Sequence, residues 1–318
     1  MRLILAALAL ASATGAVAQT YPNKPIRYVI PYPPGGGTDT YGRIVADRLA
    51  DRLGQPVIVN NVAGGSGTVG SDQVRRADAD GYTLLFNASL FLLGKNVLKS
   101  TPYDPLEDFT ALGRMGEAPL LIVSSTRLEA TTLAETLKLA REKPNTFNFA
   151  VSGMGSAGHL ATLEFLRLAK LDLVTIPYKG TAPAMQDVMG GSAQLFIDPL
   201  TVLLPQTRGG KLRALAVTSP TRVRQAPDIP SVVEAGMPGL ANMVSWWGVW
   251  GPKGLPAPIA QRISAALTDA AKAPELVQRA ENLGIVPSYM PPAQFVEFMR
   301  GDLTRSVALL KGANFQPD

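Results

Sequence analysis

The sequence predicts an α/β protein whose sheets are largely parallel. Short apolar runs of strand composition alternate with longer stretches of helical periodicity, which is the pattern of parallel sheets covered by helices. The 318 residues are 46% apolar, enough to build full hydrophobic cores. The chain has no cysteine, so these cores rather than disulfides must hold the fold together.

The N-terminus has the features of a cleaved secretory signal. Arg2 is followed by the apolar run Leu3–Ala11, which is too short to cross a bilayer. Small residues at Ala16 and Ala18 predict cleavage after Ala18, so residues 1–18 are the expected signal peptide. The mature chain then has 318 − 18 = 300 residues and, without Arg2, a net charge of 29 − 25 = +4. Because no cysteine is present for a lipid anchor, we expect a free, soluble protein in a periplasm.

The first strand and helix are the clearest predicted elements. Ile26–Tyr32 is apolar enough for a buried strand, and Thr38–Gly54 follows with helical periodicity. Thr38 or Asp39 can cap the start of this helix, and Gly54 can supply the left-handed residue that ends it. Further elements are the strands Pro56–Asn60 and Tyr82–Asn87 and a helix near Thr68–Ala77.

The same alternation repeats from Leu120. The letters "TLAE" at Thr132–Glu135 form a capping box, which opens a helix reaching about Lys143. A second helix ends near Ala169, and a third covers Ala182–Met189. The predicted strands of this half are Leu120–Ser124, Phe147–Val151, Leu173–Tyr178, Ala193–Asp198 and Leu212–Thr218.

The remaining third of the chain begins with a crossover and ends with helices. Ser219–Pro230 contains three prolines and is typical of a surface connection, and Ser245–Gly251 is the next predicted strand. Prolines near the first turns indicate the starts of three helices. These helices are Pro258–Lys272, Pro274–Leu283 and Pro292–Gly312.

The residues available for catalysis are few. His159 is the only histidine, and without cysteine neither thiol nucleophiles nor cysteine-containing zinc sites are possible. Ser156 lies three residues before His159, but "GMGSAGH" does not fit the G-x-S-x-G pattern of serine hydrolases. Acidic residues are scattered, so no metal site is expected. We predict that the chain is not an enzyme.

Dinucleotide, nucleotide and nucleic-acid binding are also unsupported. Gly65–Gly70 matches G-x-G-x-x-G, but four residues separate it from the preceding strand, where the dinucleotide fingerprint needs a tight turn. The ordinary interpretation is a flexible turn ahead of a helix. No P-loop is present, and no run of lysine and arginine indicates nucleic acid. We therefore expect no cofactor.

Two glycine-rich turns, one in each half of the chain, carry the main functional signal. Residues 33–39 and 152–158 each follow a predicted strand and open a predicted helix. Glycine lets a ligand approach the backbone closely, and the first N–H groups of a helix favour an anion. Ligands of α/β sheets bind beyond the carboxyl ends of the strands, where such turns lie. Two facing turns of this kind predict a clamp for a carboxylate that needs neither a metal nor a lysine.

At this point the chain resembles a known family, the solute-binding proteins of tripartite tricarboxylate transporters, also called the Bug receptors. The matching stretches occur in order over nearly the whole mature chain. They are "YPNKPIRYVIPYPPGGGTD", "LGQPVIVNNVAGGSGTVG", "ADGYTLL", "YDPLEDFTALG", "SGMGSAGHLATLEF", "IPYKGTAPAMQDVMGG", "GKLRALAVTS" and "WWGVWGPKGLPAPI".

The resemblance implies a two-lobed periplasmic binding fold of the type II-like, Venus-flytrap kind, with a mixed, largely parallel sheet in each lobe. Residues 19–120 and 222–318 would form lobe 1, and residues 121–221 would form lobe 2. The family binds small carboxylates between the lobes, and its two glycine loops map onto Pro34–Asp39 and Ser152–Ser156. Both loops would grip one ligand carboxylate, partly through ordered water.

The candidate ligand-binding residues come from these turns and from the ends of neighbouring strands. Phe91 and Trp247 are further candidates for the cavity wall. The full set is Tyr32, Gly35, Gly36, Gly37, Thr38, Asp39, Asn87, Ser89, Ser152, Gly153, Gly155, Ser156, His159, Asp198 and Trp246.

The aromatic residues keep two ligand classes open, an aliphatic di- or tricarboxylate and an aromatic carboxylate. We expect a monomer that delivers its ligand to the membrane permease of a tripartite tricarboxylate transporter. Two alternatives remain at this point. One is a sensor that passes a ligand signal to a membrane kinase, and the other is a secreted serine esterase acting through Ser156.

Overall fold

The computed structural model describes residues 21–317, so the predicted signal peptide lies outside the described residues. In this part of the chain ten strands are linked by hydrogen bonds in the order β2-β1-β3-β9-β4-β7-β5-β6, and β8 and β10 both pair with β4. The strands are β1 Ile26–Ile30, β2 Val57–Asn61, β3 Thr83–Ala88, β4 Phe109–Ser125, β5 Asn148–Val151, β6 Val174–Pro177, β7 Leu195–Pro199, β8 Leu212–Val217, β9 Val244–Pro252 and β10 Val286–Met290.

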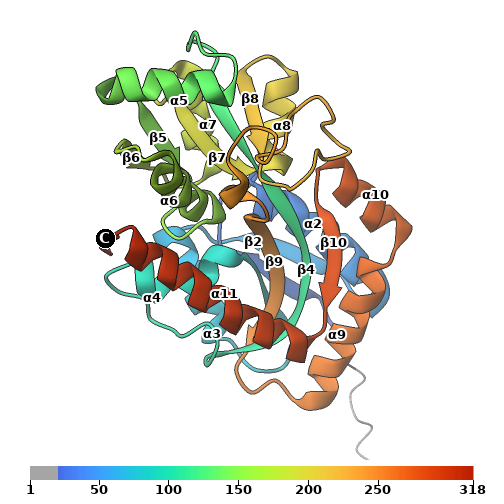
Figure 1. Cartoon of the computed structure of the whole chain (residues 1–318). Helices are drawn as coiled ribbons and strands as arrows, with labels where there is room; N and C mark the ends of the chain where they lie inside the picture. Colours follow the sequence, from blue (N-terminus) through green and yellow to red (C-terminus); the bar gives the residue numbers. More distant parts are fainter. Residues whose placement is uncertain (1–20, 318) are drawn as a thin grey trace, which may run out of the picture.

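The long strand β4 joins two lobes, as Figure 1 shows. Its first part, Phe109–Pro119, pairs antiparallel with β9 and also contacts β10. Its second part, Leu120–Ser125, pairs antiparallel with β7 and β8. Parallel pairing occurs in β2-β1-β3 of the first lobe and in β6-β5-β7 of the second. The predicted α/β class with a mixed sheet in each lobe is therefore confirmed.

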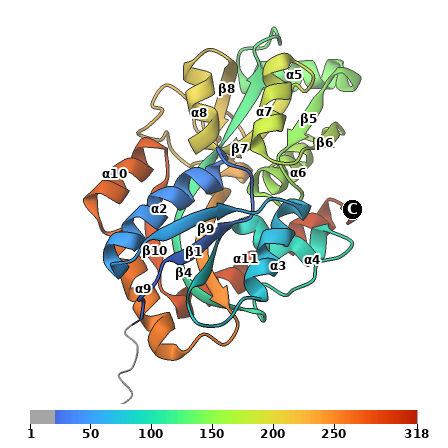
Figure 2. The same ribbon diagram turned by 180° about the vertical axis from the view of Figure 1, so that it is seen from behind.

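Helices cover the sheet of each lobe on both faces (Figures 1 and 2). The α-helices are α2 Gly37–Leu53, α3 Thr68–Arg75, α4 Gly94–Val97, α5 Leu133–Glu142, α6 Ala157–Ala169, α7 Thr181–Gly190, α8 Leu200–Arg208, α9 Ala257–Ala271, α10 Pro274–Asn282 and α11 Pro292–Gly312. Short 3₁₀ turns are η1 Gly65–Gly67, η2 Ser89–Leu93, η3 Pro144–Thr146 and η4 Pro238–Leu240.

Two strands differ from the sequence prediction. β4 was expected only at Leu120–Ser124, because the preceding "TALGRMGEAP" contains glycines, a proline and charges that disfavour a strand. Pairing with β9 along Phe109–Pro119 overrides these local preferences, with register shifts at Ala111/Gly113 and Arg114/Gly116. β10 was missed altogether; its Pro287 is tolerated where the strand pairs only with β4.

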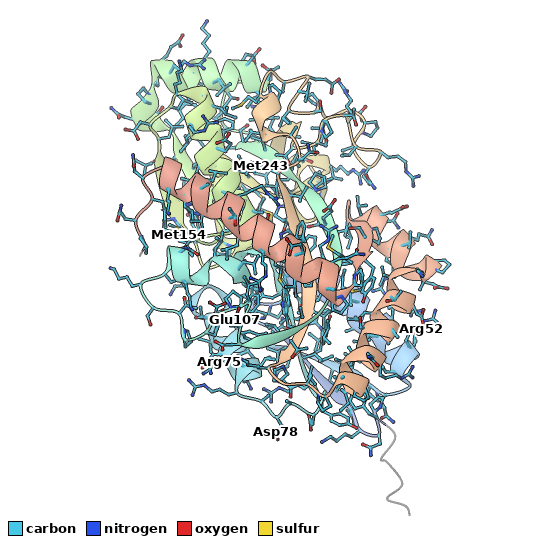
Figure 3. All side chains as sticks on the ribbon, turned by 60° about the horizontal axis from the view of Figure 1, so that its bottom comes forward. Arg52, Arg75, Asp78, Glu107, Met154 and Met243 are labelled. Carbon is cyan, nitrogen blue, oxygen red and sulfur yellow. The ribbon has the colours of Figure 1, made fainter. Side chains whose placement is uncertain are left out.

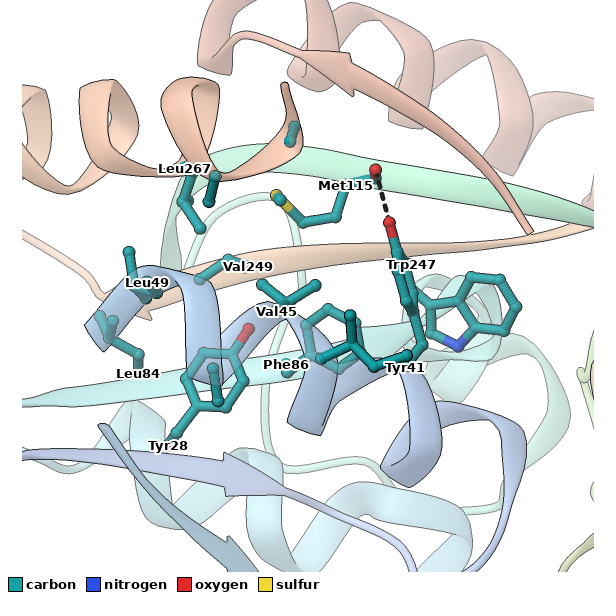
Figure 4. Packing of buried hydrophobic residues seen from close by; sticks show 14 of the residues in the cluster. Tyr28, Tyr41, Val45, Leu49, Leu84, Phe86, Met115, Trp247, Val249 and Leu267 are labelled. Atoms are coloured by element: carbon teal, nitrogen blue, oxygen red, sulfur yellow. Dashed lines mark hydrogen bonds between the residues drawn. The ribbon is translucent and has the colours of Figure 1, made fainter. Parts of the chain in front are cut away.

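The core of the first lobe forms where α2, α9 and α10 pack on one face of the sheet. Tyr41 on α2 inserts its ring between Phe86 and Trp247, at centroid distances of 5.9 and 5.4 Å. Its hydroxyl donates to the carbonyl of Met115 at 2.8 Å, as drawn in Figure 4. The Trp247 ring is therefore held by core contacts with Tyr41 on one side, and its other side faces the space between the lobes.

The chain returns to the first lobe later than the sequence suggested. Val232, Met237 and Leu240 belong to the core of the second lobe, together with Phe149 and Phe165. β9 then begins at Val244 and leads back to the first sheet. We therefore propose that the second lobe extends to about residue 243, rather than ending at residue 221.

An apolar cluster bridges the lobes beside β9. Leu93 and Val97 of the first lobe pack with Leu160 on α6 and with Leu310 near the end of α11. Met154 and Met243, labelled in Figure 3, are partly buried against the same cluster. The end of α11 lies next to α6 in both ribbon views. The two glycine-rich turns are thus presented by lobes that already touch.

Candidate ligand-binding site

A cavity of about 580 Å³ lies between the lobes at the carboxyl ends of the parallel strands. The segments after β1, β2 and β3 form one wall, and those after β5, β6 and β7 form the other, with the start of β9 at the base. This is the position at which α/β sheets bind ligands. The lining residues fall within 31–38, 63–67, 88–90, 152–158, 178–183, 198–199 and 245–247.

The first glycine turn leads directly into α2. The helix is capped by Gly36 and not by Thr38 or Asp39, which corrects the predicted N-cap. The first helical bond joins Thr40 N to Gly36 O at 2.9 Å, so the N–H groups of Gly37 and Thr38 precede the helical ladder. Gly36, Gly37 and Thr38 line the cavity. This end of α2 is therefore a suitable site for an anion.

Asp39 holds this turn in place rather than lining the cavity. Its carboxylate accepts hydrogen bonds from Gly35 N at 2.9 Å, Arg43 Nε at 3.0 Å and Asn61 Nδ2 at 2.9 Å. Burial works against ionisation, but these hydrogen bonds prevail and lower the pKa of Asp39. Asp39 and Gly35 were both predicted to bind ligand, but neither lines the cavity: Asp39 is buried behind the wall, and Gly35 is exposed outside it.

Of the two residues predicted at the end of β3, one lines the cavity and one does not. Ser89 lines the cavity, as does Tyr32 after β1, whereas Asn87 is buried beneath them. Tyr32 Oη donates to Asn87 Oδ1 at 2.6 Å, and Asn87 Nδ2 donates to Ser71 Oγ at 3.1 Å. Asn87 therefore orients the Tyr32 ring without a place at the cavity surface.

The second glycine turn leads into α6. More of its N–H groups than in the first turn are already used in hydrogen bonds to side chains of the same segment. Ser156 caps the helix and accepts from His159 N at 3.0 Å, while Gly155 N donates to His159 Nδ1 at 3.0 Å. The N–H groups of Ala157 and Gly158 lie ahead of the first helical bond, from Leu160 N to Ser156 O. These two N–H groups are positioned to donate hydrogen bonds to an anion in this lobe.

Five predicted residues occupy different depths around this turn. Ser152, Gly153 and Ser156 line the cavity, whereas Gly155 and His159 lie behind them. Gly155 has a left-handed φ of +78° and faces Leu93 and Val97 across the lobe interface. His159 is 2% exposed and packs edge-on against Phe315 near the C-terminus, with centroids 5.1 Å apart. Its position one turn into α6 supports the turn from within.

Asp198, at the end of β7, is buried and lines the cavity. Ser152 Oγ donates to its Oδ1 at 2.8 Å, and Thr181 Oγ1 donates to its Oδ2 at 2.6 Å. Burial raises the pKa of Asp198 to about 7, although the hydrogen bonds from Thr181 and Ser152 oppose the shift. The carboxyl thus links the turn before α6 to the first residue of α7.

Trp246 was predicted to bind ligand, but it does not line the cavity. Trp246 Nε1 donates to Asp302 at 3.0 Å, and its ring packs against Phe295 on α11. Neighbouring residues of a strand point to opposite faces, and Trp247, which was also predicted as a wall residue, faces the cavity. Trp247 Nε1 donates to Thr38 Oγ1 at 3.0 Å and braces the first glycine turn. Phe91, the other wall candidate, is also in the core, where it contacts Trp250.

Two lining segments were missed by the sequence prediction. The "GSGTVG" stretch was interpreted as an ordinary turn, yet Ala63–Gly67 lines the cavity, with Ser66 at a left-handed φ of 53°. The other segment is Tyr178–Pro183, which precedes and opens α7. One signal could have indicated both segments: each contains glycine and directly follows a strand, β2 or β6, that pairs with β1 or β5.

A second hollow, of about 460 Å³, lies at the far end of the second lobe. Its arginines are already engaged with backbone carbonyls: Arg208 donates to Gln225 O, and Arg213 donates to Leu128 O and Ala130 O. It lacks the converging helix N-termini of the interlobe cavity. Within residues 21–317, no group of three His, Asp or Glu residues could hold a metal ion, and no helix is long and apolar enough to span a membrane.

Two lobes joined by the long strand β4, with a cavity between them, have the architecture of a two-lobed solute-binding protein. The model of the tripartite tricarboxylate transporter receptor family matches residues 41–315. The chain therefore belongs to this family of periplasmic solute-binding receptors, and it is a receptor rather than an enzyme. The resemblance drawn from the glycine turns is confirmed.

Known relatives agree with this assignment over nearly the full length. The chain is 33% identical over 318 residues to Protein BugT of Bordetella pertussis, covering 98% of this chain and 97% of BugT. The structure of the periplasmic binding protein BugD superposes with a TM-score of 0.88 at 31% identity, covering 94% of this chain and all of BugD. Rpa4515 of R. palustris, solved with adipate, gives a TM-score of 0.90 at 29% identity, covering 94% and 100%.

Proposed function

We propose that this receptor captures a small carboxylate between its lobes in the periplasm and delivers it to the permease of a tripartite tricarboxylate transporter. The observation that carries the proposal is the convergence of the α2 and α6 N-termini on one cavity, each with N–H groups ahead of its helical ladder. Such groups bind anions without a cationic side chain. Export through the signal peptide, with cleavage after Ala18, and a monomeric state are part of the same proposal.

The cavity favours a ligand with an anionic group at one or both ends and an apolar middle. Tyr32, Leu90 and Trp247 supply apolar surface between the two glycine turns. A relative with the same architecture was solved with adipate, which has this distribution of charge. We therefore place aliphatic dicarboxylates first. Aromatic carboxylates, which could stack on Trp247 or Tyr32 for about 0.5–1.5 kcal/mol beyond area burial, come second.

The ligand class is tested by a thermal-shift screen of matched carboxylates. Succinate, adipate and citrate represent the aliphatic class, and benzoate and terephthalate represent the aromatic class. A ligand present at a hundredfold over its Kd stabilises the folded state by about 2.7 kcal/mol. We expect an aliphatic dicarboxylate to give the largest shift. If no carboxylate shifts the transition at any pH between 5.5 and 8, the proposed ligand class is refuted.

The clamp itself is tested by titration calorimetry on two glycine variants. Gly36 and Gly153 line the cavity and have negative or extended φ, and an added Cβ meets nothing closer than 4.0 Å at either position. We expect Gly36→Val and Gly153→Val each to raise the Kd for the ligand at least tenfold, a loss of about 1.4 kcal/mol of binding free energy, because the added side chain blocks approach to the backbone. Gly190→Val is the control, because Gly190 also has open space but lies at the far end of α7. Unchanged affinity in both clamp variants would contradict the proposal.

A further inference from the structure

Asp198 is the only carboxyl among the described residues that line the cavity. It is 2% exposed, and its two oxygens accept hydrogen bonds from Ser152 and Thr181. The other acid close to the glycine turns, Asp39, is neutralised by Arg43 and lies behind the wall. Asp198 has no such cationic partner among the described residues, since no ion pair forms at it.

This carboxyl lies beside the place where an anion would bind α6. A methyl group on Gly158 would be only 3.0 Å from Asp198 Oδ1, and Gly158 N–H is one of the two groups ahead of the helical ladder. Because Gly158 and Asp198 both line the cavity, a ligand carboxylate that accepts from this N–H lies close to the carboxyl of Asp198. Two negative charges so close in a site shielded from water cannot both persist without a large cost.

We propose that Asp198 is a ligand-binding residue that acts in its protonated form, donating its O–H to the ligand carboxylate. This rests on the proposed function, because it concerns the same cavity. The proton comes from solvent on binding and returns to solvent on release. Ser152 and Thr181 keep their roles, since a carboxylic acid still has lone pairs that accept from two hydroxyls.

The surroundings of Asp198 make this protonation accessible near neutral pH. Burial raises its pKa to about 7, and a second carboxylate in the cavity shifts the balance further toward the acid. On β4 its neighbour in register is the apolar Leu121. Three other packed segments carry titratable groups. His159 lies on α6, the exposed Lys179 and the half-buried Tyr178 lie before α7, and Asp187 lies on α7. Tyr178 Oη donates to Asp187 at 2.7 Å.

The consequence is that carboxylate binding takes up a proton. At pH well above 7 free Asp198 is ionised, so binding must include uptake of one proton and the Kd must rise tenfold per pH unit. At pH 6 Asp198 already carries the proton, so its titration no longer makes the Kd depend on pH. Because both carboxyl groups of adipate are ionised from pH 6.5 to 9, the probe does not titrate in this window.

The experiment is titration calorimetry with adipate, or with succinate if adipate gives no thermal shift. Binding enthalpies in phosphate and Tris at pH 8 report the number of protons exchanged. We expect about one proton taken up by the unmodified protein and none by Asp198→Asn. The Kd should rise about tenfold from pH 8 to pH 9 in the unmodified protein and stay within twofold in Asp198→Asn.

Two further variants separate a binding role from a structural one. Thr181→Val removes a hydroxyl that stabilises the ionised form of Asp198, so the onset of the pH dependence should move to higher pH. His159→Gln removes the only histidine of the chain and should retain uptake of one proton, whatever its affinity. A purely structural role for Asp198 would change affinity without changing proton uptake.

The outcomes are distinguishable from those of the proposed function. Binding of adipate or succinate without proton uptake at pH 8, or with uptake that persists in Asp198→Asn, overturns the role of Asp198 and leaves the receptor function intact. Absence of binding by every carboxylate, at every pH, overturns both. Loss of proton uptake in His159→Gln would assign the proton to the imidazole and also refute the inference.

Discussion

Replacing Gly155 by alanine tests how the lobes are held against each other. Gly155 has a φ of +78°, which costs an L-residue about 1–2 kcal/mol. Its added methyl would lie 3.1 Å from Val97 Cγ2 and 3.2 Å from Leu93 Cβ. These contacts are tighter than ordinary packing, and overpacking of this kind costs about 1–3 kcal/mol. The sum is a loss of about 2–5 kcal/mol while the lobes remain in their present contact.

The crowding part of this cost can be relieved by opening the lobes. Val97 and Leu93 belong to the first lobe and Gly155 to the second, so separation of the lobes removes the clash but not the backbone strain. Urea denaturation measures the loss of stability, and small-angle X-ray scattering measures the opening. We expect Gly155→Ala to lower the free energy of unfolding by at least about 1 kcal/mol and to increase the radius of gyration.

A double variant separates the two contributions. Val97→Ala removes both valine methyls that the new Cβ meets but leaves the contact with Leu93 Cβ, so Gly155→Ala/Val97→Ala should recover part of the crowding cost relative to the sum of the single variants. Gly153→Ala is the matched control in the same turn, with open space and no left-handed φ, and should change stability by less than about 0.5 kcal/mol. Additive effects of Gly155→Ala and Val97→Ala, with no change in scattering, would refute the reasoning.

Three further predictions concern stability in the absence of ligand. Thr132→Ala removes the capping box of α5 and should cost about 1 kcal/mol in urea denaturation, whereas loss of less than about 0.3 kcal/mol would contradict the cap. Tyr32→Phe removes the donor to Asn87 Oδ1 and should cost about 0.5–1.5 kcal/mol by the same method; no change would mean that the bond is unimportant. Asp198 has a folded pKa of about 7 against an ordinary value of 3.8, so its contribution to stability is fully present below pH 3.8 and is lost as pH rises to about 7. About two of the 7 − 3.8 = 3.2 pH units of this shift fall between pH 5 and pH 8, so at 1.36 kcal/mol per unit Asp198→Asn should remove about 3 kcal/mol of the stability difference between these two pH values; parallel pH profiles for both proteins would refute the shift.

The fold was predictable where short-range signals decide the structure. Gly54 ends α2 in a left-handed conformation, and Thr132 and Glu135 form their reciprocal cap, as the letters alone predict. The first part of β4 was not predictable, because Gly113 and Gly116 disfavour a strand and only the pairing with β9 makes one. Long-range pairing is therefore the information that local composition lacks.

The candidate site was predictable to the level of segments but not of individual side chains. Both glycine turns lie at the cavity, since their position follows from the order of strands and helices. Which of Trp246 and Trp247 faces the cavity depends on the register of β9, and a shift of one residue reverses the answer. The depth of Asp39 and Asn87 likewise depends on hydrogen-bond partners 22 and 16 positions away along the chain.

The two glycine turns look alike in sequence but differ in chemistry, and this difference bears on how the receptor closes. The α2 turn is held in place by Asp39, whose charge is neutralised by Arg43, so its N–H groups are able to donate to an anion at any pH at which the ligand is ionised. In the α6 turn Gly155 N–H already donates to His159, and the turn lies next to Asp198. An anion that reaches both turns must therefore satisfy amides in one lobe and a proton-dependent group in the other. If Asp198 acts as proposed, the ligand is released more easily wherever Asp198 is free to ionise.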